Sequence, residues 1–367
     1  MSIVNVMWAG GLPFASVHKV HCQILSQIDS AMPVKTWLLQ GSASACQEDV
    51  GPAREWNLTS ARLKGRRFWR LLKPWMHHRF RRALLDDGTR VVLLDGLGVV
   101  RTLLPVLKSL PHVRVVVVFH GVTRFNARNR QLLRDFPSSR LVLAAVSETL
   151  ASSLQDELGI PVTALRSAFD PVAFRSRLVS REEARARLGL PLAGIRIFGA
   201  IGRLVDKKGF SSLLDAFAIA ALDQPDWRLV IVGEGPARQS LEARATKPDL
   251  AGKVLLAGHQ EDVVKLYKAF DWVMIPSFEE GLGLILQEAV LAGIPVLASD
   301  LAVFREQLAD VGWYVPAGDE VAWSEAIIRA SLDRAEAVSA AQYQALAPDE
   351  AWVSFCRTAR ELISDGK

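Results

Sequence analysis

The sequence predicts an α/β protein built from two doubly wound parallel sheets, and three observations lead to this fold class. The chain has 367 residues, more than the roughly 250 to 300 at which a single hydrophobic core stops growing. Short apolar runs alternate with amphipathic stretches, as parallel strands joined by crossover helices do. This alternation occupies both halves, with a change of pattern at residues 171–193. Because 50% of the residues are hydrophobic and 23% charged, the composition excludes a disordered chain.

The first half, residues 1–170, predicts one domain. Its strand candidates are Ile3–Trp8, Thr36–Gln40, Val91–Leu94, Arg114–Phe119, Leu141–Val146 and Val162–Leu165. Residues 171–193 are interpreted as a linker, in which Ser180 caps a short helix, Arg181–Leu188, that Gly189 and Pro191 end.

The second half, residues 194–346, repeats the alternation more regularly. Its strand candidates are Ile195–Ile201, Arg228–Val232, Lys253–Ala257, Trp272–Ile275, Pro295–Ala298 and Gly312–Val315. We expect residues 347–367 to form a closing helix that packs back on the first domain. Two such sheets facing each other would place a ligand cleft between the carboxyl ends of their strands.

Charge is distributed unevenly along the chain. The net charge is +5, but residues 1–170 carry 22 Lys and Arg against 12 Asp and Glu, a net +10, whereas residues 171–367 carry 22 against 27, a net −5. A basic half indicates an anionic partner on that side. The cysteines, Cys22, Cys46 and Cys356, have unrelated spacings, which favours a reducing compartment. No apolar run approaches the length of a membrane span, and the start lacks the features of a signal peptide, so we expect a cytoplasmic protein.

The segment Pro276–Gly293, PSFEEGLGLILQEAVLAG, follows a buried strand and opens a helix. Glu280 and Glu288 lie a little over two helical turns apart. Gly281 and Gly283 leave backbone N–H groups accessible at the helix start, where a phosphate or a sugar hydroxyl can bind. The simpler interpretation is that Glu280 complements the helix dipole and that Glu288 is a solvated surface residue.

A second segment places cations after a strand. Strand Ile195–Ile201 runs into Gly202 and Arg203, and then into Lys207, Lys208 and Gly209. Two cations on a glycine-containing loop at a strand's carboxyl end can clamp a diphosphate, although a basic loop is often merely solvated. The pattern GxGxxG of dinucleotide-binding proteins is absent here and after the first strand, which disfavours a dehydrogenase.

Together these residues resemble the retaining glycosyltransferases of family 4, which have the GT-B fold. The resemblance rests on GRLVDKKGF, on VGEGP at Val232–Pro236, on Asp271 before PS, and on EGLG followed by QEAVLAGIPVLAS. It extends from about Ile195 to Ala298. It implies a GT-B protein with two Rossmann-like domains facing a central cleft, of the type that acts in the bacterial cell envelope or on lipopolysaccharide core.

The resemblance also implies roles for individual residues. Arg203 and Lys208, after Gly202, would bind the donor diphosphate and stabilise the charge that develops on it. Glu280 would hold donor-sugar hydroxyls, and Glu288 would accept hydrogen bonds from the ribose. The remaining donor contacts would come largely from backbone at Gly258, His259, Gly281, Leu282, Gly283 and Leu284. Leu282 stands where the family has phenylalanine.

The first half resembles the family less closely. Gly10 and Gly11 follow the first strand and resemble the family's flexible glycine loop, although an ordinary strand-to-helix turn would look the same. His120 follows a buried strand, where a family histidine contacts the donor sugar; alternatively it is a hydrogen-bonded histidine at a strand edge. Ser147 is expected to cap a helix. The family's asparagine-glycine turn is replaced by Ser167–Asp170, which leaves any contact from that turn open.

A basic, aromatic segment lies at residues 61–85. It contains nine Lys and Arg and no acid, together with Phe68, Trp69, Trp75 and Phe80. Such a pattern suits an anionic membrane surface; nucleic acid is the alternative partner, and a solvated basic helix with aromatics in the core is the simplest interpretation. We expect Pro74 to kink or divide the helix. The residues assigned to membrane or acceptor are Arg66, Arg67, Trp69, Arg70, Trp75, Arg124 and Arg128, with Arg130 and Arg134 in the same basic strip.

The function expected from these features is a retaining hexosyltransferase. It would move a sugar from a nucleotide diphosphate sugar, with a UDP-sugar favoured over a GDP-sugar, to a membrane-associated bacterial glycolipid, with lipopolysaccharide core as the first candidate. We expect no cofactor, no metal, since no D-x-D triplet occurs, no nucleic-acid partner, and a peripheral location on the cytoplasmic face of the inner membrane. The alternatives are a polyprenyl-diphosphate-linked or capsular saccharide as acceptor, a GT-B nucleotide-sugar epimerase, and a catalytically silent scaffold.

Overall fold

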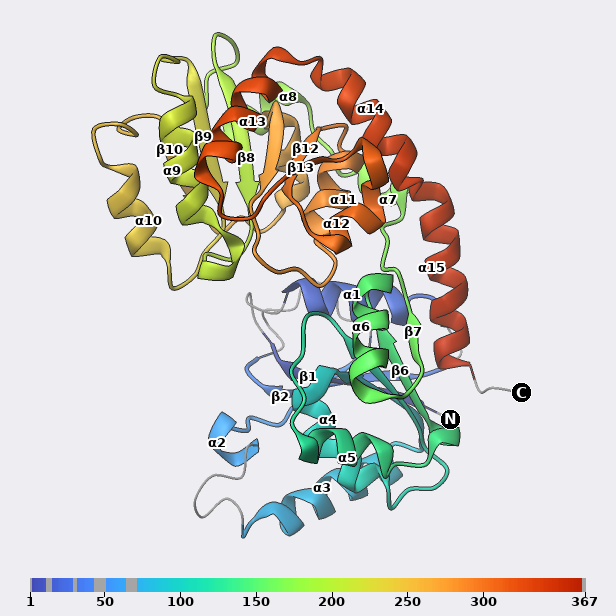
Figure 1. Ribbon diagram of the computed structural model, residues 1–367. Helices are drawn as coiled ribbons and strands as arrows, with labels where there is room; N and C mark the ends of the chain where they lie inside the picture. Colours follow the sequence, from blue (N-terminus) through green and yellow to red (C-terminus); the bar gives the residue numbers. More distant parts are fainter. Residues whose placement is uncertain (1, 11–14, 29–31, 43–50, 64–70, 365–367) are drawn as a thin grey trace. The chain divides into compact units, whose positions relative to one another are not determined.

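The computed structural model describes residues 2–10, 15–28, 32–42, 51–63 and 71–364. The chain divides into two compact units (Figure 1). Unit 1 comprises the residues up to Ser167 and those from Val353 onward, and unit 2 is Ala168–Trp352. Among the described residues, none of the helices has the length and apolar character needed to cross a membrane.

Unit 1 contains a seven-stranded parallel sheet in the order β3-β2-β1-β4-β5-β6-β7. All six strands expected from the sequence are present. The additional strand, β3, consists of three exposed residues, so it has no apolar signal. The bounds are β1 Ser2–Ala9, β2 Val34–Gln40, β3 Ala53–Glu55, β4 Thr89–Asp95, β5 Arg114–Phe119, β6 Leu141–Ala145 and β7 Val162–Ala164.

The helices of unit 1 are α1 Ala15–Leu25, α2 Ser60–Leu63, α3 Lys73–Asp86, α4 Gly96–Leu107, α5 Ala127–Arg134 and α6 Glu148–Leu158, with a 3-10 turn at Ser138–Arg140. Ser147 caps α6 as expected, since its hydroxyl accepts the N–H of Leu150 at 3.2 Å. Pro74 lies in the first turn of α3, where its missing N–H costs nothing, so it does not kink this helix. The alternative, that Pro74 divides a longer helix, stays a prediction, because residues 64–70 lie outside the described residues.

The last helix, α15 Pro348–Ile363, continues from unit 2 into unit 1. Its part in unit 1 buries Phe355, Ala359 and Leu362. Beyond its end, the carbonyl oxygen of Ser364 accepts a hydrogen bond from Arg114 at the start of β5. This part of the chain is therefore integrated into the core of unit 1.

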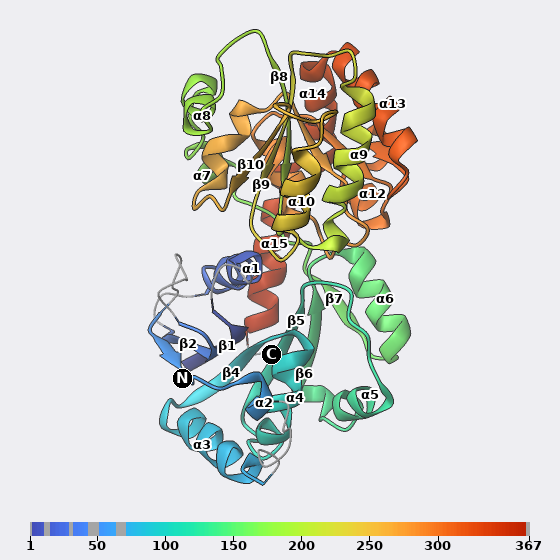
Figure 2. The same ribbon diagram turned by 90° about the vertical axis from the view of Figure 1, so that its left-hand side faces the viewer.

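Unit 2 contains a six-stranded parallel sheet in the order β10-β9-β8-β11-β12-β13. Three of its strands, β8, β9 and β10, are labelled in Figure 2. The six strands expected from the sequence are all present, with ends that differ by no more than one residue. Their bounds are β8 Arg196–Ile201, β9 Trp227–Val232, β10 Val254–Gly258, β11 Trp272–Ile275, β12 Val296–Ser299 and β13 Trp313–Val315.

Alternate residues of these strands enter two separate core clusters. On β8, Ile197 and Ile201 belong to one cluster, and Phe198 and Ala200 to the other. Because successive side chains point to opposite faces, helices cover both faces, as a doubly wound sheet requires. The helices are α7 Pro171–Arg175, α8 Arg181–Arg187, α9 Phe210–Ala220, α10 Arg238–Ala245, α11 Leu284–Leu291, α12 Ala302–Leu308, α13 Glu320–Leu332 and α14 Ala335–Leu346, with 3-10 turns at Asp206–Lys208, Val263–Ala269 and Ala309–Val311.

Residues 171–193, interpreted as a linker, are folded into unit 2. The expected helix is present as α8, capped by Ser180 through the N–H of Glu183. Arg185 of this helix is fully buried and donates to the carbonyl oxygens of Ala269 and Leu192. Asp271, part of the family motif, accepts the N–H of Ile197 at 2.7 Å, so it holds the start of β11 against β8 and not a ligand.

Each sheet has one position where the order of its strands reverses. In unit 1 it lies between β1 and β4, and in unit 2 between β8 and β11. The two crossover connections leave such a pair of strands in opposite directions, which opens a crevice at the carboxyl ends. The segments with the predicted site residues, after β8 and β11 and after β1 and β5, follow strands at or next to these positions.

Candidate functional site

In unit 2, the loop that follows β8 is fastened to the segment that follows β11. Gly209 has a φ of +69°, and a Cβ at this position would lie 2.0 Å from the carbonyl oxygen of Pro276. Only glycine permits this approach. Phe278 donates its N–H to the carbonyl oxygen of Lys207 at 2.9 Å. The two segments therefore hold the neighbouring Lys208 and Glu280 next to each other.

Lys208 and Glu280 form an ion pair. Ser277, which the sequence analysis did not identify, donates its hydroxyl to the same oxygen, Oε1 of Glu280, at 2.8 Å. Both charged side chains are largely shielded, with 20% and 12% of their surface exposed. The structure thus brings together two of the predicted catalytic residues, and each charge fixes the position of the other.

Arg203 has a different environment, because its side chain is exposed. In the part of the chain that the structure describes, no carboxylate forms an ion pair with it, whereas the exposed Lys207 lies 3.6 Å from Glu279. Arg203 is therefore the cation on this loop that can meet an anionic ligand directly.

The start of α11 provides backbone donors beside this ion pair. Gly281, Leu282 and Gly283 are buried, and Leu284 is the first residue of the helix. Gly283 has a φ of +79°, and a Cβ there would lie 2.4 Å from the ring of Phe304. The first N–H groups of a helix have no partner within it and carry partial positive charge. The buried Leu282 side chain is consistent with a role through its backbone alone.

Glu288, on α11, is buried, and its Oε2 accepts the hydroxyl of Tyr267 at 2.7 Å. Burial, together with the neighbouring carboxylate, raises the pKa of Tyr267 well above its usual value, so this hydroxyl remains a donor. The interpretation of Glu288 as a solvated surface residue is therefore wrong. Tyr267 was not identified from the sequence.

The loops after β8, β9 and β10 are joined by backbone hydrogen bonds. Gly202 donates to the carbonyl oxygen of Val232 at 3.0 Å, and Gly233 donates to that of Gly258 at 2.8 Å. A Cβ on Gly258, whose φ is +71°, would lie 3.3 Å from Oε1 of Glu234. His259 follows with an exposed side chain. The predicted contact of these residues with a base remains a prediction.

In unit 1, Gly10 follows β1 and donates its N–H to the carbonyl oxygen of Gln40 at 2.9 Å. A Cβ at Gly10 would lie 2.6 Å from the carbonyl oxygen of Ser42, so the glycine is required by close backbone contact. Gly11 lies outside the described residues. Close contact with the neighbouring backbone therefore explains the glycine at position 10 without a bound ligand.

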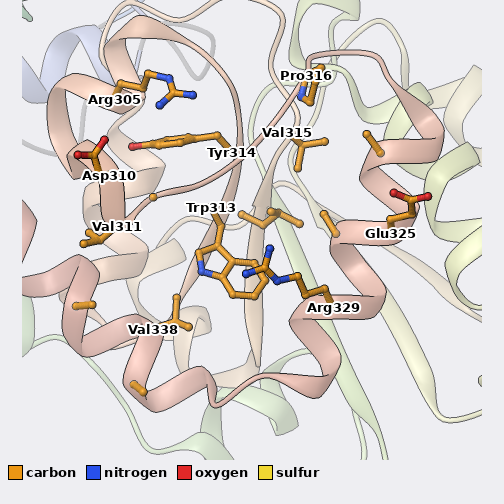
Figure 3. A pocket seen from close by; sticks show the side chains of 16 residues that line it. Arg305, Asp310, Val311, Trp313, Tyr314, Val315, Pro316, Glu325, Arg329 and Val338 are labelled. Carbon is orange, nitrogen blue, oxygen red and sulfur yellow. The ribbon is translucent and has the colours of Figure 1, made fainter.

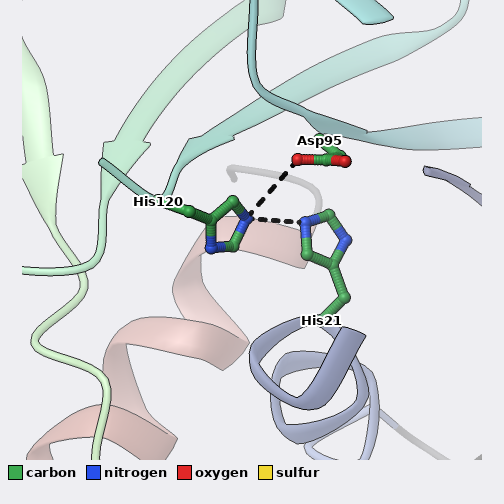
Figure 4. A group of neighbouring side chains, drawn as sticks. All are labelled: His21, Asp95 and His120. Atoms are coloured by element: carbon green, nitrogen blue, oxygen red, sulfur yellow. Dashed lines mark hydrogen bonds and ion pairs between the residues drawn. The ribbon is translucent and has the colours of Figure 1, made fainter. Parts of the chain in front are cut away.

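His120, after β5, lies in a cluster with His21 of α1 and Asp95 at the end of β4 (Figure 4). Its Nε2 is 3.1 Å from Nε2 of His21 and 4.0 Å from Oδ1 of Asp95. Burial lowers the pKa of His120 to about 3 and raises that of Asp95 to about 6. The ligand atoms of the three residues lie within 4.8 Å of one another, a grouping that could hold a metal ion. His120 is thus part of a buried polar cluster.

The basic segment is described only in part, since Arg66, Arg67, Trp69 and Arg70 lie outside the described residues. In α3, Phe80 is fully buried, whereas Trp75 is 59% exposed and stacks against Arg79, whose guanidinium carbon is 4.8 Å from the ring centre. Leu71 and Leu72, which precede α3, are also exposed. The aromatic residues therefore divide between core and surface.

The second basic strip also divides. Arg124 and Arg128 are exposed. Arg134 instead donates two hydrogen bonds to the carbonyl oxygen of Leu158 at the end of α6, and Arg130 donates to that of Phe125. The guanidinium groups of Arg130 and Arg134 are therefore held by backbone carbonyl oxygens, whereas the exposed Arg124 and Arg128 are the two that were assigned to membrane or acceptor.

A further pocket in unit 2 lies beside β13, between residues of α13 and α14 (Figure 3). Its arginines are engaged with aromatic rings: Arg329 lies 4.6 Å from the ring centre of Trp313, and Arg305 lies 4.5 Å from that of Tyr314. Arg305 also pairs with Asp300 at 2.6 Å. Since none of the predicted site residues lines this pocket, the candidate site is the one at the ends of β8 and β11.

Comparison with known proteins connects this site to a family. Residues 180–346 match the family of glycosyl transferases, group 1. A 2-deoxystreptamine glucosyltransferase of Streptomyces kanamyceticus is 30% identical over 161 residues, which cover 42% of each protein. The lipopolysaccharide core biosynthesis mannosyltransferase LpsB of Rhizobium meliloti is 28% identical over 207 residues, 54% of this chain and 56% of that protein. The chain thus spans about half the length of the curated relatives it matches.

Solved structures extend the likeness to the whole fold. A glycosyltransferase from Rickettsia africae superposes with a TM-score of 0.81 at 15% identity, covering 100% of this chain and 99% of that one. Anabaena HepE, in complex with UDP and glucose, gives 0.80 at 18% identity, with 100% of both chains covered. The prediction of a GT-B protein with two Rossmann-like domains is confirmed.

Several polar residues of these sites were missed in the sequence. Ser277 and Tyr267 contact predicted residues, but no spacing in the sequence assigns either of them a role. Asn5 and Asp95 did carry a signal in the sequence, because each is a polar residue in or at the end of an apolar strand. Buried polar groups in such positions usually have partners, and here they belong to the cluster around His120.

Proposed function

We propose that the protein is a retaining, metal-independent hexosyltransferase that uses a nucleotide diphosphate sugar as donor. The observation that carries this proposal is the contact between Lys208 and Glu280, next to the start of α11, at the position where strand order reverses in unit 2. The contact lies within the segment that matches the group 1 glycosyl transferases. A diphosphate needs cations and N–H donors at one place, and this site offers both.

In the proposed reaction, the acceptor hydroxyl oxygen bonds to the anomeric carbon as the bond from that carbon to the diphosphate oxygen breaks on the same face. The hydroxyl proton passes to the departing diphosphate. Arg203, Lys208 and the N–H groups at the start of α11 stabilise the negative charge that grows there. Glu280 holds donor-sugar hydroxyls and faces the positive charge on the sugar. No step requires a metal, so addition of EDTA should leave the rate unchanged.

Glu288 is proposed to accept hydrogen bonds from the ribose hydroxyls. Its carboxylate is oriented by Tyr267, which reduces the conformational freedom lost when a nucleotide binds. A UDP-sugar is the first candidate donor, a choice supported by the structural likeness to Anabaena HepE in complexes with UDP and with UDP-glucose.

The acceptor is proposed to be a lipid-anchored glycan with phosphate groups, lipopolysaccharide core first, at the cytoplasmic face of the inner membrane. The exposed Arg124 and Arg128 would meet phosphates, and the basic segment with exposed Trp75 would contact anionic lipid. The name of the Rhizobium relative, a lipopolysaccharide core mannosyltransferase, supports this acceptor class.

The donor proposal is tested by calorimetry with a panel of UDP- and GDP-sugars, followed by the anomeric configuration of the product. Lys208→Ala should lower kcat about 10²- to 10³-fold, as loss of one transition-state donor does. Lys207→Ala is the matched control, because Lys207 is adjacent but exposed. Urea unfolding of both lysine variants shows whether a lower kcat reflects lost stability or lost catalysis. If no nucleotide sugar binds, or if both lysine variants behave alike, the proposal is wrong.

The membrane proposal is tested with vesicles of anionic and of neutral lipid. Replacing Arg66, Arg67 and Arg70 of the basic segment with glutamate should release the protein from anionic vesicles, since each cation near the surface contributes about 1 kcal/mol. The control is the replacement with glutamate of Lys247 and Arg334, two exposed cations of unit 2. Unchanged binding of the first variant would refute the membrane role of Arg66, Arg67 and Arg70.

A further inference from the structure

His120 is linked to a buried histidine of α1. The Nε2 atoms of His21 and His120 lie 3.1 Å apart, with ring centres separated by 5.1 Å (Figure 4). His21 is completely buried, whereas His120 retains some exposure. Two ring nitrogens at this distance require one proton between them, because two lone pairs would repel each other.

The other nitrogen of His21 determines which histidine supplies that proton. Nδ1 of His21 lies 2.7 Å from the amide oxygen Oδ1 of Asn5. Asn5 is buried in β1, and its amide nitrogen donates to the hydroxyl oxygen of Thr36 at 3.3 Å. An amide oxygen can only accept, so Nδ1 of His21 carries the hydrogen. Burial lowers the pKa of His21 well below its usual value. The neutral ring therefore has a lone pair at Nε2.

The tautomer of His120 follows from that of His21. Since Nε2 of His21 accepts, Nε2 of His120 must donate, and the neutral ring then has its lone pair at Nδ1. Asp95 reinforces this choice, because its Oδ1 lies 4.0 Å from the same Nε2. The other oxygen of Asp95 accepts the N–H of Trp8 at 3.1 Å, which fixes the carboxyl group. Among the described residues, no hydrogen-bond partner faces Nδ1 of His120.

We propose that Asn5 and His21 are positioning residues that hold His120 with Nδ1 as an acceptor. In this tautomer His120 can accept a hydrogen bond from a hydroxyl of the donor sugar, the ligand that the family resemblance assigns to this histidine. A neutral acceptor nitrogen binds an O–H donor, whereas the lone pair of this nitrogen would repel a phosphate oxygen, which is itself an acceptor at neutral pH. The identification of this hydroxyl as that of a sugar rests on the proposed function.

The same three side chains could instead bind a metal ion. Four-coordinate zinc with bonds of about 2.0 to 2.1 Å keeps its ligand atoms about 3.3 Å apart. The separation of 3.1 Å between the imidazole nitrogens is also that of a hydrogen bond, and Asp95 at 4.0 Å lies farther than the zinc geometry requires. A bound zinc ion and the proposed hydrogen bond predict opposite tautomers of His120, because zinc at Nε2 would leave the hydrogen on Nδ1.

The tautomers can be read directly by ¹⁵N NMR of the imidazole nitrogens in the full chain at neutral pH, with and without Zn²⁺. We expect Nδ1 of His21 and Nε2 of His120 to be protonated. A hydrogen on Nδ1 of His120, or stoichiometric Zn²⁺ binding that shifts both Nε2 signals, would overturn the assignment. His21→Phe and Asp95→Asn identify the signals and any metal ligands.

The positioning role is tested with Asn5→Leu, which removes the acceptor for His21, and with Asn5→Asp, which retains one. Asn5→Leu should lower kcat for UDP-glucose hydrolysis or transfer at least tenfold while the Kd for UDP stays within twofold. Asn5→Asp should restore most of the rate and the tautomers. Thr36→Val, which leaves the contact between Asn5 and His21 intact, is the matched control and should remain near wild type. A normal kcat in Asn5→Leu refutes the role.

These readouts separate the inference from the function on which it rests. If no nucleotide sugar supports turnover, the proposed function fails, while the NMR still decides the tautomers. If turnover occurs but the tautomers are reversed, the function stands and the positioning by Asn5 and His21 is refuted. Should Asn5→Leu fail to fold, the NMR of the wild-type protein decides the assignment alone.

Discussion

Replacing Tyr267 with phenylalanine isolates one buried hydrogen bond at the candidate nucleotide site. The Tyr267 hydroxyl donates to Glu288 at 2.7 Å, and both side chains are buried. A hydrogen bond to a charged group contributes about 1.5 to 3 kcal/mol, and the variant removes this donor. Phenylalanine fills the same space, so little packing is lost. We therefore expect the free energy of unfolding of unit 2 to fall by about 1.5 to 3 kcal/mol.

The assay is urea unfolding combined with thermal melting, in which a loss of this size lowers the melting temperature by about 3 to 12 °C for a unit of this length. Tyr343→Phe is the matched control, since the Tyr343 hydroxyl contacts Arg175 at the surface, and a change within about 0.5 kcal/mol is expected. Glu288→Gln completes a double-mutant cycle. A loss below 0.5 kcal/mol, or a coupling energy near zero, would refute the argument.

Two further predictions concern backbone strain and protonation. Gly209→Ala should lower the free energy of unfolding, measured with urea, by about 2 to 4 kcal/mol: about 1 from the left-handed backbone and the rest from the contact with Pro276. The control is Gly189→Ala, which has a φ of +65° and no atom within 4 Å and should cost only about 1 kcal/mol. Equal losses in the two variants would contradict the close approach of Gly209 to Pro276. Asp95, with its pKa raised by burial to about 6, binds a proton more strongly when folded, so its contribution to the free energy of unfolding falls as pH rises from about 4 to 6. Relative to wild type, Asp95→Asn should gain up to about 3 kcal/mol between pH 4 and 7. The lowered pKa of His120 changes the free energy of unfolding with pH in the opposite direction. The quantity to measure is therefore the difference in this free energy between Asp95→Asn and wild type, and a difference independent of pH would contradict a raised pKa of the Asp95 carboxyl group.

The strands could be predicted from the sequence because most are buried on both faces. Such strands are continuous apolar runs, such as Arg114–Phe119, and twelve of the thirteen produced that signal. The exception, β3, is short and exposed, so its position is set by pairing with β2 and not by its own residues. Local patterns therefore predicted every strand but β3, one of the two edge strands of the sheet in unit 1.

The linker was harder to interpret, since its composition is polar. Arg185 and the charges around it indicate a solvated helix in the sequence, yet the guanidinium is buried against carbonyl oxygens and Asp271. A buried arginine is recognised only when its partners are known, and two of them, Ala269 and Asp271, lie 84 and 86 residues further along the chain. The candidate site shows the same limit: motif residues such as Lys208 and Glu280 could be named, but Ser277 and Tyr267 could not.

The charge asymmetry that indicated an anionic partner does not extend into the polar cluster of unit 1. The residues around His120 are two imidazoles held neutral by burial and one carboxyl group. The basic charge of this half lies instead on exposed arginines, and part of it, Arg134, caps a helix. In unit 2, whose sequence is acidic overall, cations lie beside the start of α11. Net charge per half therefore describes surfaces, and a phosphate-binding role must be argued from the few cations placed at strand ends.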